Sequence, residues 1–269
     1  MKKMKWVAAA VAAVMAMGLL AGCSAGAPAS SAAPSAGAES AAPDANGGSD
    51  KKVLRLGTDA AFPPFEFQEG NDFMGIDIDI GRAVADELGM DFEVVNMDFD
   101  SLLGALESGK VDLVAAGMTI RPDREKQADF SDTYYQATQV ITVMKDNAEI
   151  KGVDDLKNKK IGVQKGTTGE ELAREIEGAE VLSFANGQEA GLAMKTGKVD
   201  AVLYDAGPSQ KMVAQNDDMT IIEDDSFDKE EYAIAVKKGD EDMLKAVNDT
   251  LAKLEQSGEM DKIVEKYNN

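Results

Sequence analysis

The chain has 269 residues and a formal charge of −21 at pH 7, from 49 acidic and 28 basic residues. This excess of negative charge argues against binding to nucleic acid or anionic lipid by charge, since both are themselves anionic. The chain has no histidine and a single cysteine. These counts exclude histidine-based catalytic triads, the commonest metal ligand and a disulfide within the chain, so we expect no metal and no cofactor.

The first 22 residues have the pattern of an export signal. Three lysines precede an apolar run from Trp6 to Gly22, which is shorter than the roughly 20 residues of a membrane-spanning helix. The run ends in Leu-Ala-Gly-Cys, with small residues directly before Cys23. We predict a signal peptide over 1–22. The alternatives are an ordinary signal with a chance cysteine and an uncleaved membrane anchor.

Residues 24–50 are rich in Ser, Ala, Pro and Gly and lack large apolar side chains. Such a segment cannot bury a core, and we predict a flexible tether with a root-mean-square span of roughly 30 Å. Removal of residues 1–22 takes three lysines away, which changes the formal charge from −21 to −24.

The first folded unit alternates strands and helices. Strands are predicted over 52–57, 92–97 and 111–116, and helices over 77–88 and from 98 to 109. This βαβαβ order is typical of a parallel sheet with right-handed crossovers.

The same order returns in the second half of the chain. The sequence predicts strands over 160–164, 181–184 and 199–205, with helices that start at Glu170 and Gln188. A further strand is expected over 232–236, and a helix over 240–267 with a break at Gly258.

A short repeat links the two halves. Gly-Lys-Val-Asp occurs at 109–112 and at 197–200, each time after a predicted helix and before a predicted strand. The repeat predicts two similar α/β lobes.

The end of strand 111–116 carries Thr119 and Arg124. Ligands of open α/β sheets lie at the carboxyl ends of strands, and arginine can clamp a carboxylate with two parallel hydrogen bonds. We therefore predict that Arg124 holds the carboxylate of a small ligand, with Pro122 in the first turn of a helix. The alternative is a solvated arginine paired with Asp123 or Glu125.

The corresponding edge of the second lobe carries Gln164, Thr167, Thr168 and Asp205. Helix-start residues Thr167 and Thr168 favour an anion, whereas Asp205 can accept an ammonium group. Acid and base on opposite edges suit a zwitterion, and thus a free α-amino acid. For Asp205 the alternative is a helix N-cap.

The loop after the first strand contains Asp59 and three phenylalanines. Phe65 and Phe67 are expected in the core. Phe62, next to Asp59 at the strand tip, is the candidate for a wall of the ligand site.

At this point the motifs resemble a known family, the family 3 solute-binding proteins, which are the polar-amino-acid receptors of ABC importers. The resemblance covers essentially all of residues 51–269. It rests on Asp-Ala-Ala-Phe-Pro-Pro-Phe-Glu-Phe (59–67), Gly-Ile-Asp-Ile-Asp (75–79), Ala-Gly-Met-Thr-Ile-Arg-Pro-Asp-Arg (116–124), Asp-Phe-Ser-Asp-Thr-Tyr-Tyr (129–135), Gly-Val-Gln-Lys-Gly-Thr-Thr-Gly (162–169) and Asp-Ala-Val-Leu-Tyr-Asp (200–205).

The resemblance implies a type II periplasmic-binding-protein fold, with two lobes joined by two hinge strands and the ligand between them. Residues 51–136 and 232–269 would form the first lobe, and 137–231 the second lobe with the hinge strands. The Leu-Ala-Gly-Cys motif resembles the bacterial lipobox, so Cys23 would carry acyl chains and 23–50 would tether a monomeric receptor to the outer face of the cytoplasmic membrane.

The resemblance also implies roles for residues at the ends of the ligand. Arg124 would bind the carboxylate with help from the Thr119 and Thr168 amides. The ammonium group would contact Asp205, the Gly117 carbonyl and the Thr119 hydroxyl.

Four residues would surround the ligand side chain: Asp59, Phe62, Phe99 and Gln164. Phe62 stands where many relatives have tyrosine, and Gln164 holds a variable position. Asp59 suits a basic or amide side chain, so the expected ligands are Arg, Lys, His or Gln.

The partner would be a membrane permease. Without histidine, affinity is expected to be nearly flat from about pH 5.5 to 8.

Two other functions remain open. The same fold hosts dehydratases of cyclic carboxylic acids, for which Asp59 and Glu66 would be candidate acids, although we predict that the chain is not an enzyme. A sensory or adhesive surface module is the second alternative. Acid pairs such as Asp77/Asp79 and Asp224/Asp225 are expected to be solvated or capping and not metal-binding.

Overall fold

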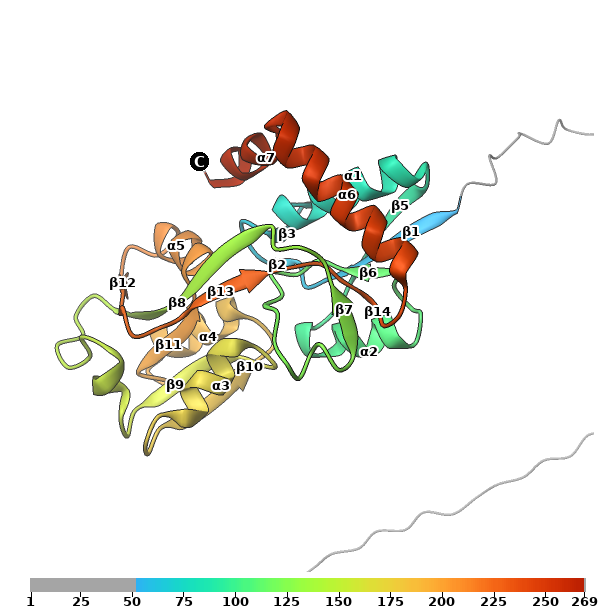
Figure 1. Cartoon of the computed structure of the whole chain (residues 1–269). Helices are drawn as coiled ribbons and strands as arrows, with labels where there is room; N and C mark the ends of the chain where they lie inside the picture. Colours follow the sequence, from blue (N-terminus) through green and yellow to red (C-terminus); the bar gives the residue numbers. More distant parts are fainter. Residues whose placement is uncertain (1–51, 269) are drawn as a thin grey trace, which may run out of the picture. The chain divides into compact units, whose positions relative to one another are not determined.

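A computed structural model describes residues 52–268, which form two lobes, each built around one large sheet (Figure 1). The predicted signal peptide (1–22), Cys23 and the tether to residue 50 lie outside the described residues. Between residues 52 and 268, no helix combines the length and the apolar character that crossing a membrane requires.

The main sheet of the first lobe is mixed. β1 is parallel to β5 and β6, whereas β14 is antiparallel to β6 and β7. In spatial order its strands are β5 (Asp91–Asn96), β1 (Val53–Thr58), β6 (Leu113–Val114), β14 (Ala235–Lys237) and β7 (Ala128–Phe130). A small antiparallel sheet beside it contains β2 (Ala61–Phe62), β3 (Glu66–Glu69) and β4 (Asp72–Met74). The predicted parallel βαβαβ order is confirmed in β1, β5 and β6.

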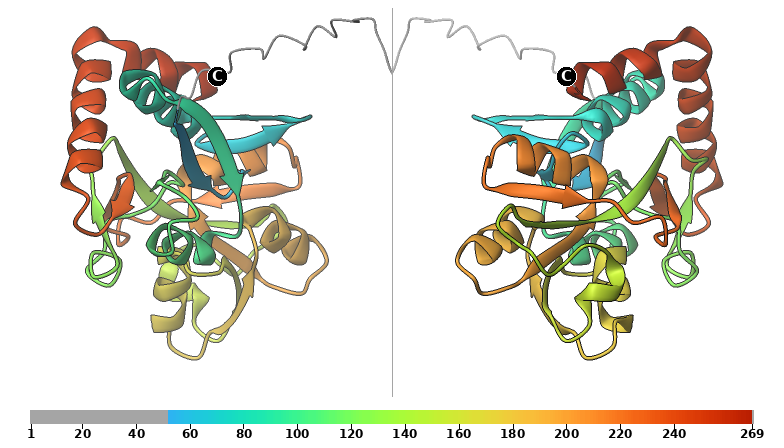
Figure 2. Two further views of the ribbon diagram at one scale, coloured as in Figure 1. Left: turned by 90° about the vertical axis from the view of Figure 1, so that its right-hand side faces the viewer. Right: turned by 90° about the vertical axis from the view of Figure 1, so that its left-hand side faces the viewer.

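Helices from both ends of the described chain cover the first lobe. They are α1 (Ile76–Leu88), η1 (Phe99–Ser101), α2 (Leu102–Glu107), α6 (Glu241–Ser257) and α7 (Glu259–Asn268). The predicted break at Gly258 is confirmed, because this glycine takes φ 69° and ends α6. Figure 2 shows α6 and α7 packed beside α1, so the C-terminal segment completes the first lobe.

The second lobe has three parallel strands followed by an antiparallel pair. β10, β9 and β11 are parallel, and β8 is antiparallel to β11 and β12. The strands in spatial order are β10 (Glu180–Phe184), β9 (Lys160–Gln164), β11 (Ala201–Asp205), β8 (Tyr135–Met144) and β12 (Met219–Ile222). The helices are η2 (Val153–Leu156), α3 (Thr168–Glu175), α4 (Gly187–Lys195) and α5 (Ala206–Ala214).

The repeated Gly-Lys-Val-Asp has the same structural role in both lobes. Asp112 accepts a hydrogen bond from the backbone N–H of Arg55 at 2.8 Å, and Asp200 accepts one from the backbone N–H of Lys160 at 2.7 Å. Each aspartate therefore fixes the entry to its own strand against the start of a neighbouring parallel strand. The two lobes are built alike at this point.

Two chain segments pass between the lobes. β8 leaves the first lobe, and β13 (Lys229–Tyr232) returns antiparallel to its first half, from Lys229 opposite Thr138 to Tyr232 opposite Tyr135 (Figure 1). The single strand predicted over 232–236 is wrong: β13 ends at Tyr232, and β14 begins at Ala235 in the other sheet. The chain changes sheets here, where the backbone N–H of Ala233 donates to the Met118 carbonyl.

Candidate functional site: a cavity between the lobes

All ten predicted ligand contacts line one cavity between the two lobes. They are Asp59, Phe62, Phe99, Gly117, Thr119, Arg124, Gln164, Thr167, Thr168 and Asp205. Ala116, Glu66 and Glu230 also line the cavity and were not predicted as contacts. The free space is only about 10 Å³, roughly that of one water molecule. An amino acid can therefore enter only if the lobes move apart.

Arg124 is the basic side chain of this cavity. It is 4% exposed, donates to the Thr119 carbonyl at 2.8 Å and to the Gly166 carbonyl of the other lobe at 3.0 Å, and lies 5.2 Å over the Phe99 ring. Burial, followed by the nearby Arg121, lowers the pKa of Arg124 to about 10. The guanidinium therefore remains charged at neutral pH and is held by two carbonyl groups.

The alternative of a solvated Arg124 paired with Asp123 or Glu125 is not what the structure shows. Asp123 pairs instead with Arg121, at 2.8 Å. The predicted helix after Ile120 is also wrong, because residues 122–127 form turns that close with a hydrogen bond from the Ala128 N–H to the Arg124 carbonyl. This turn directs Arg124 inward.

Asp205 lies at the end of β11 and is 5% exposed. It occupies the N-cap position of α5 but forms no side-chain cap hydrogen bond, and it accepts a hydrogen bond from the Tyr232 hydroxyl at 2.5 Å. Burial, and then the Glu230 carboxylate, raise the pKa of Asp205 to about 7. Because the carboxyl does not cap α5, it is free to contact a ligand in the cavity. Its ionised form is poorly solvated there.

Glu230 joins the two lobes through polar contacts. It accepts hydrogen bonds from the Thr119 hydroxyl at 2.5 Å and from the Gln139 amide at 2.8 Å, and it is 7% exposed. The charged sequence Lys229-Glu-Glu-Tyr232 is typical of a solvated strand, which is why Glu230 was not predicted to line the cavity. The alternating burial of β13, with Glu230 and Tyr232 both inward, is the period-2 signal that could have identified it.

Asp59 lies at the opposite wall. Its Oδ2 accepts hydrogen bonds from the Phe99 N–H at 3.2 Å and from the Gln164 amide of the second lobe at 2.9 Å. Burial raises the pKa of Asp59 to about 6, although the Phe99 N–H lowers it. Phe62 is 6% exposed and packs edge-on against Tyr204, with 5.3 Å between ring centroids.

Two fully buried acids, Glu66 and Asp77, lie at the first-lobe wall of the cavity. Asp77 accepts hydrogen bonds from the Gly117 N–H and the Tyr134 hydroxyl, each at 2.8 Å, and is fully buried. The prediction of a solvated or capping Asp77 is therefore wrong. Burial, and then the Asp77 carboxylate, raise the pKa of Glu66 well above its usual range, so Glu66 is the protonated member of the pair.

Ion pairs hold the rim of the cavity closed. Lys165 of the second lobe pairs with Asp100 at 2.7 Å, and Glu171 pairs with Arg121 at 2.5 Å. Lys165 is thus engaged at the rim and does not line the cavity. Both pairs disappear if the lobes separate.

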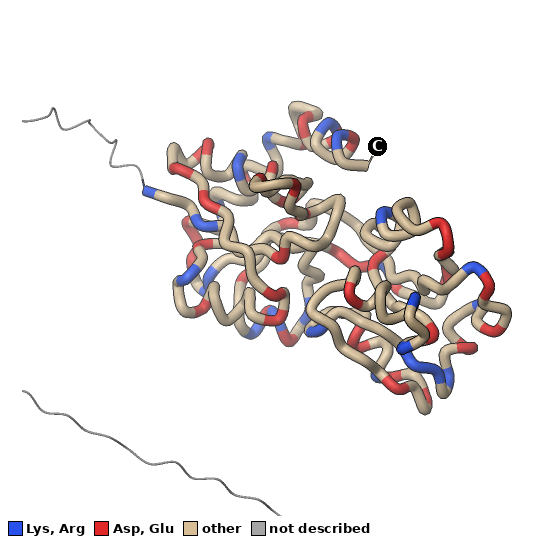
Figure 3. The backbone as a smooth tube through the Cα atoms, turned by 180° about the vertical axis from the view of Figure 1, so that it is seen from behind, with Lys and Arg blue, Asp and Glu red and all other residues tan. Residues whose placement is uncertain are grey.

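The cavity is strongly acidic. Its lining contains Asp59, Asp205 and Glu230, together with the protonated Glu66, and one arginine. Acidic residues elsewhere are spread over both lobes (Figure 3). Within residues 52–268, no three His, Cys, Asp or Glu side chains are grouped closely enough to hold a metal ion. The arrangement can accept one anionic group at Arg124 and more than one cationic group at the carboxyls.

Gly117 allows a mutational test of the cavity wall. It has φ 53°, and a Cβ there would lie 2.5 Å from the Phe62 ring. Gly117→Ala is expected to lower the free energy of unfolding by more than about 1 kcal/mol and also to abolish ligand binding, because the positive φ disfavours alanine and Phe62 must shift. The matched control is Gly109→Ala, since Gly109 has φ 74° but no neighbour within 4 Å of a Cβ.

Denaturant unfolding and calorimetric titration of both variants check this. Gly109→Ala is expected to lose only the stability that the positive φ costs, about 1 kcal/mol, and to keep normal ligand affinity. Normal affinity in Gly117→Ala would contradict the assigned wall.

Comparisons with known proteins agree with this geometry. Residues 54–269 match the family of bacterial extracellular solute-binding proteins, family 3. A probable histidine-binding protein of Neisseria gonorrhoeae is 37% identical over 99% of this chain and 96% of its own, and the arginine-binding extracellular protein of Bacillus subtilis (strain 168) is 36% identical over 86% and 92%. Among solved structures, an ancestral arginine-binding protein bound to arginine has a TM-score of 0.76 and 43% identity, covering 81% of this chain and 98% of its own.

Proposed function

The chain belongs to the family 3 bacterial extracellular solute-binding proteins, and from this premise we propose that it captures a basic L-amino acid, arginine above all, and delivers it to an ABC permease. The observation that carries the proposal is the composition of the cavity. Three acids that can carry charge, Asp59, Asp205 and Glu230, and a single buried arginine suit a ligand with one carboxylate and two cationic groups.

Each end of arginine has a partner in the proposed complex. Arg124 receives the carboxylate with the Thr119 and Thr168 amides, and Asp205 receives the ammonium with the Thr119 hydroxyl and the Gly117 carbonyl. Charge-assisted hydrogen bonds contribute about 1.5–3 kcal/mol each, so several of them support a dissociation constant on the order of micromolar or below.

The remaining predicted contacts enclose the side chain. Asp59 and Gln164 accept the guanidinium, and Phe62 and Phe99 form the walls. Thr167 supports the second lobe's wall, since its hydroxyl donates to the Gln164 carbonyl at 2.8 Å.

Binding is proposed to proceed by hinge closure about β8 and β13, with lobes of residues 51–136 and 232–269, and of 137–231. The open form admits the ligand, and the rim pairs Lys165–Asp100 and Arg121–Glu171 form on closing. The closed monomer then docks on the permease.

A thermal-shift screen of the twenty amino acids tests the function. Arginine is expected to give the largest increase in melting temperature, followed by lysine, histidine or glutamine. No shift with any amino acid would reject the proposal. Conversion of prephenate or arogenate, in the same preparation, would instead favour a dehydratase that uses Asp59 and Glu66.

The lipid anchor is a separate proposal with its own prediction. In cells that express the full-length protein, Cys23→Ala is expected to abolish the incorporation of labelled palmitate, because the acylated residue is lost. The control is Ser24→Ala, which leaves the cysteine in place. Palmitate incorporation into Cys23→Ala at the wild-type level would contradict lipidation at this residue.

A further inference from the structure

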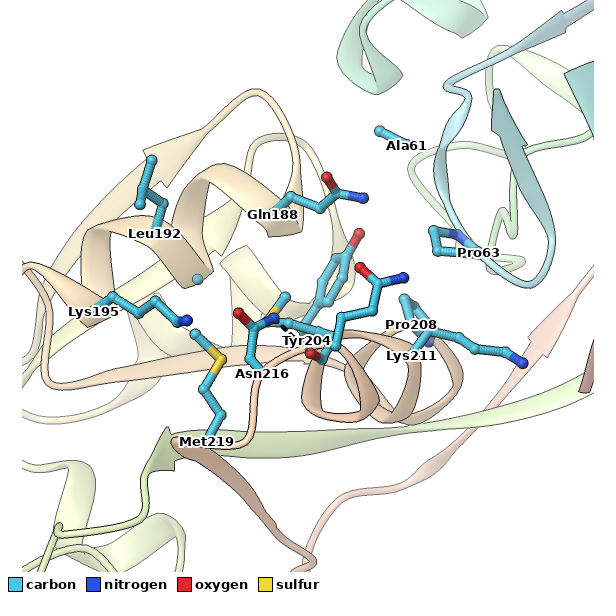
Figure 4. Close-up of a pocket in the computed structure, with 13 residues that line it drawn as sticks. Ala61, Pro63, Gln188, Leu192, Lys195, Tyr204, Pro208, Lys211, Asn216 and Met219 are labelled. Carbon is cyan, nitrogen blue, oxygen red and sulfur yellow. Dashed lines mark hydrogen bonds between the residues drawn. The ribbon is translucent and has the colours of Figure 1, made fainter. Parts of the chain in front are cut away.

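The end of β11 borders two cavities, and acids gather in one of them. Successive side chains of a strand point to opposite faces. Tyr204 lines a cavity of about 270 Å³ beside α4 and α5 (Figure 4), and the next residue, Asp205, lines the amino-acid cavity. Among the described residues 52–268, those that line the cavity of Figure 4 include no Asp or Glu, and its Lys195 pairs with Asp218 at 3.1 Å. The carboxyls that remain to be explained therefore belong to the amino-acid cavity.

Glu230 brings a second carboxyl close to Asp205. Burial, and then the Glu230 charge, raise the pKa of Asp205 to about 7, so the two carboxyls are near neighbours. They come from different strands, since Asp205 ends β11 and Glu230 lies on β13, one of the two segments that pass between the lobes. Two carboxyls held so close favour a cationic group beside them.

Hydrogen bonds join these carboxyls into one chain. Glu230 accepts from the Thr119 hydroxyl at 2.5 Å and from the Gln139 amide at 2.8 Å. Gln139 also donates to Asp205, which accepts from the Tyr232 hydroxyl at 2.5 Å. The chain thus runs from the first lobe through β8 and β13 to the second lobe. It contains both side chains that are proposed to receive the ligand ammonium, Thr119 and Asp205.

The proton of the Thr119 hydroxyl is directed to Glu230. A carboxylate only accepts hydrogen bonds, so the proton between the two oxygens comes from the hydroxyl. A hydroxyl has one proton and two acceptor lone pairs. The Thr168 hydroxyl also donates to the Thr119 oxygen, at the long distance of 3.4 Å. The Thr119 oxygen therefore offers a lone pair, and no proton, to a group that approaches it in the cavity.

We propose that Glu230 is a positioning residue for the α-ammonium group of the ligand. Because Glu230 holds the Thr119 proton, the Thr119 oxygen is kept as an acceptor for the ammonium, which can only donate. The closed cavity thereby favours a ligand with an α-ammonium over one with only hydrogen at the same carbon. This role rests on the proposed function and adds a residue that selects the substrate.

Replacement of Glu230 by glutamine reverses the polarity at Thr119. Glutamine has nearly the same shape, but its amide has one acceptor oxygen and one amino group that donates. The Gln139 amide donates towards one of these two positions, so the oxygen of the new amide takes that position and its amino group faces Thr119. The Thr119 oxygen then accepts from this amino group, and its own proton opposes the ligand ammonium.

The test compares L-arginine with 5-guanidinopentanoate, which is arginine without its α-amino group. Calorimetry on the full chain at pH 8, where Asp205 is mostly ionised, measures arginine directly and the analogue as its competitor. Glu230→Gln is expected to weaken arginine about tenfold or more and to change the analogue by about twofold or less. An equal loss for both ligands would overturn the role, because a purely structural effect acts on both alike.

A double-mutant cycle with Thr119→Val gives the second readout. Since Glu230 acts through the Thr119 hydroxyl, the double variant is expected to bind arginine within about twofold of Thr119→Val alone. Additive losses would overturn the role. If Glu230→Gln alone does not fold, Thr119→Val must still lose the preference for arginine over the analogue, and a preserved preference would overturn the role.

The matched control is Glu231→Gln. Glu231 is the next residue of β13, has an exposed side chain and does not line the amino-acid cavity, and the substitution removes the same charge. It is expected to bind both ligands as the wild type does. A loss equal to that of Glu230→Gln would show that the charge of β13, and not the contact with Thr119, is responsible.

A failure of this role can be told apart from a failure of the proposed function. If the wild type binds arginine and Glu230→Gln weakens both ligands equally, the proposed function stands and the role of Glu230 fails. If arginine does not bind the wild type, the proposed function fails and the role of Glu230 fails with it.

Discussion

Replacement of Arg124 by alanine is expected to weaken arginine binding about 100-fold or more. The guanidinium is almost fully buried and is proposed to form two charge-assisted hydrogen bonds with the ligand carboxylate. Their loss is about 3 kcal/mol at the lower bound, and each 1.4 kcal/mol changes the affinity tenfold. Isothermal titration calorimetry at pH 8 measures the effect. Arg124→Lys should bind arginine with an affinity between those of the wild type and Arg124→Ala, because lysine keeps the positive charge but cannot donate two parallel hydrogen bonds to the carboxylate.

Arg174 provides the matched control. It is an arginine of the second lobe with a largely exposed side chain, and it pairs with Glu170 outside the amino-acid cavity. Arg174→Ala is expected to bind arginine within about twofold of wild type, since exposed ion pairs contribute about 0–1 kcal/mol. A folded Arg124→Ala protein with wild-type affinity would show that the carboxylate binds elsewhere.

The second large effect is expected from pH. Lowering the pH from 8 to 5 should weaken arginine binding about 100-fold, because Asp205 must lose its proton to receive the ammonium group. Its pKa of about 7 lies two units above pH 5, and each unit corresponds to about 1.4 kcal/mol. Asp59, with a pKa of about 6, adds to the loss. The sequence predicted nearly flat affinity from about pH 5.5 to 8 because the chain has no histidine. The raised pKa values of Asp205 and Asp59 replace that prediction with a steep dependence.

Asp205→Asn separates this cause from others. The variant is expected to bind weakly at pH 8 and to show a much shallower dependence on pH. Asp86→Asn, at an exposed position of α1, should keep the wild-type profile. Calorimetry in buffers of different ionisation enthalpy should also detect proton release on binding at pH 6 to 7. A wild-type profile that is flat from pH 8 to 5 would contradict ionisation of these two carboxyls on binding.

The stability of the ligand-free protein should change in the opposite direction. In the folded state, Asp59 and Asp205 have pKa values of about 6 and 7, against about 4 in an unfolded chain. Between pH 4 and 7 the folded state therefore binds more protons, and the free energy of unfolding should rise as the pH falls from 8 to 5. If the affinity falls and the free energy of unfolding rises as the pH is lowered, the same two carboxyls, Asp59 and Asp205, explain both trends.

Much of the site could be predicted because strand ends are local in sequence. Gln164 and Asp205 end strands that periodicity identifies, and Thr119 follows one. Parallel strands bring such ends to one edge of their sheet. The repeated Gly-Lys-Val-Asp then predicted the second lobe. None of this required knowledge of how the lobes meet.

Side chains that depend on contacts between distant segments were missed. Glu230 is buried because it meets Thr119, which lies 111 residues away in sequence. Asp77 is buried because its carboxylate accepts the Gly117 N–H, 40 residues away. The turn at 122–127 was mistaken for a helix because Pro122 is compatible with both. Local patterns do not contain these tertiary contacts.

The most direct measurement is a crystal structure of the protein grown with L-arginine. We predict the arginine carboxylate within hydrogen-bond distance of the Arg124 guanidinium, and its α-ammonium within hydrogen-bond distance of the Asp205 carboxylate on the opposite lobe. A ligand bound elsewhere, or either of these two side chains turned to bulk solvent in the complex, would contradict it.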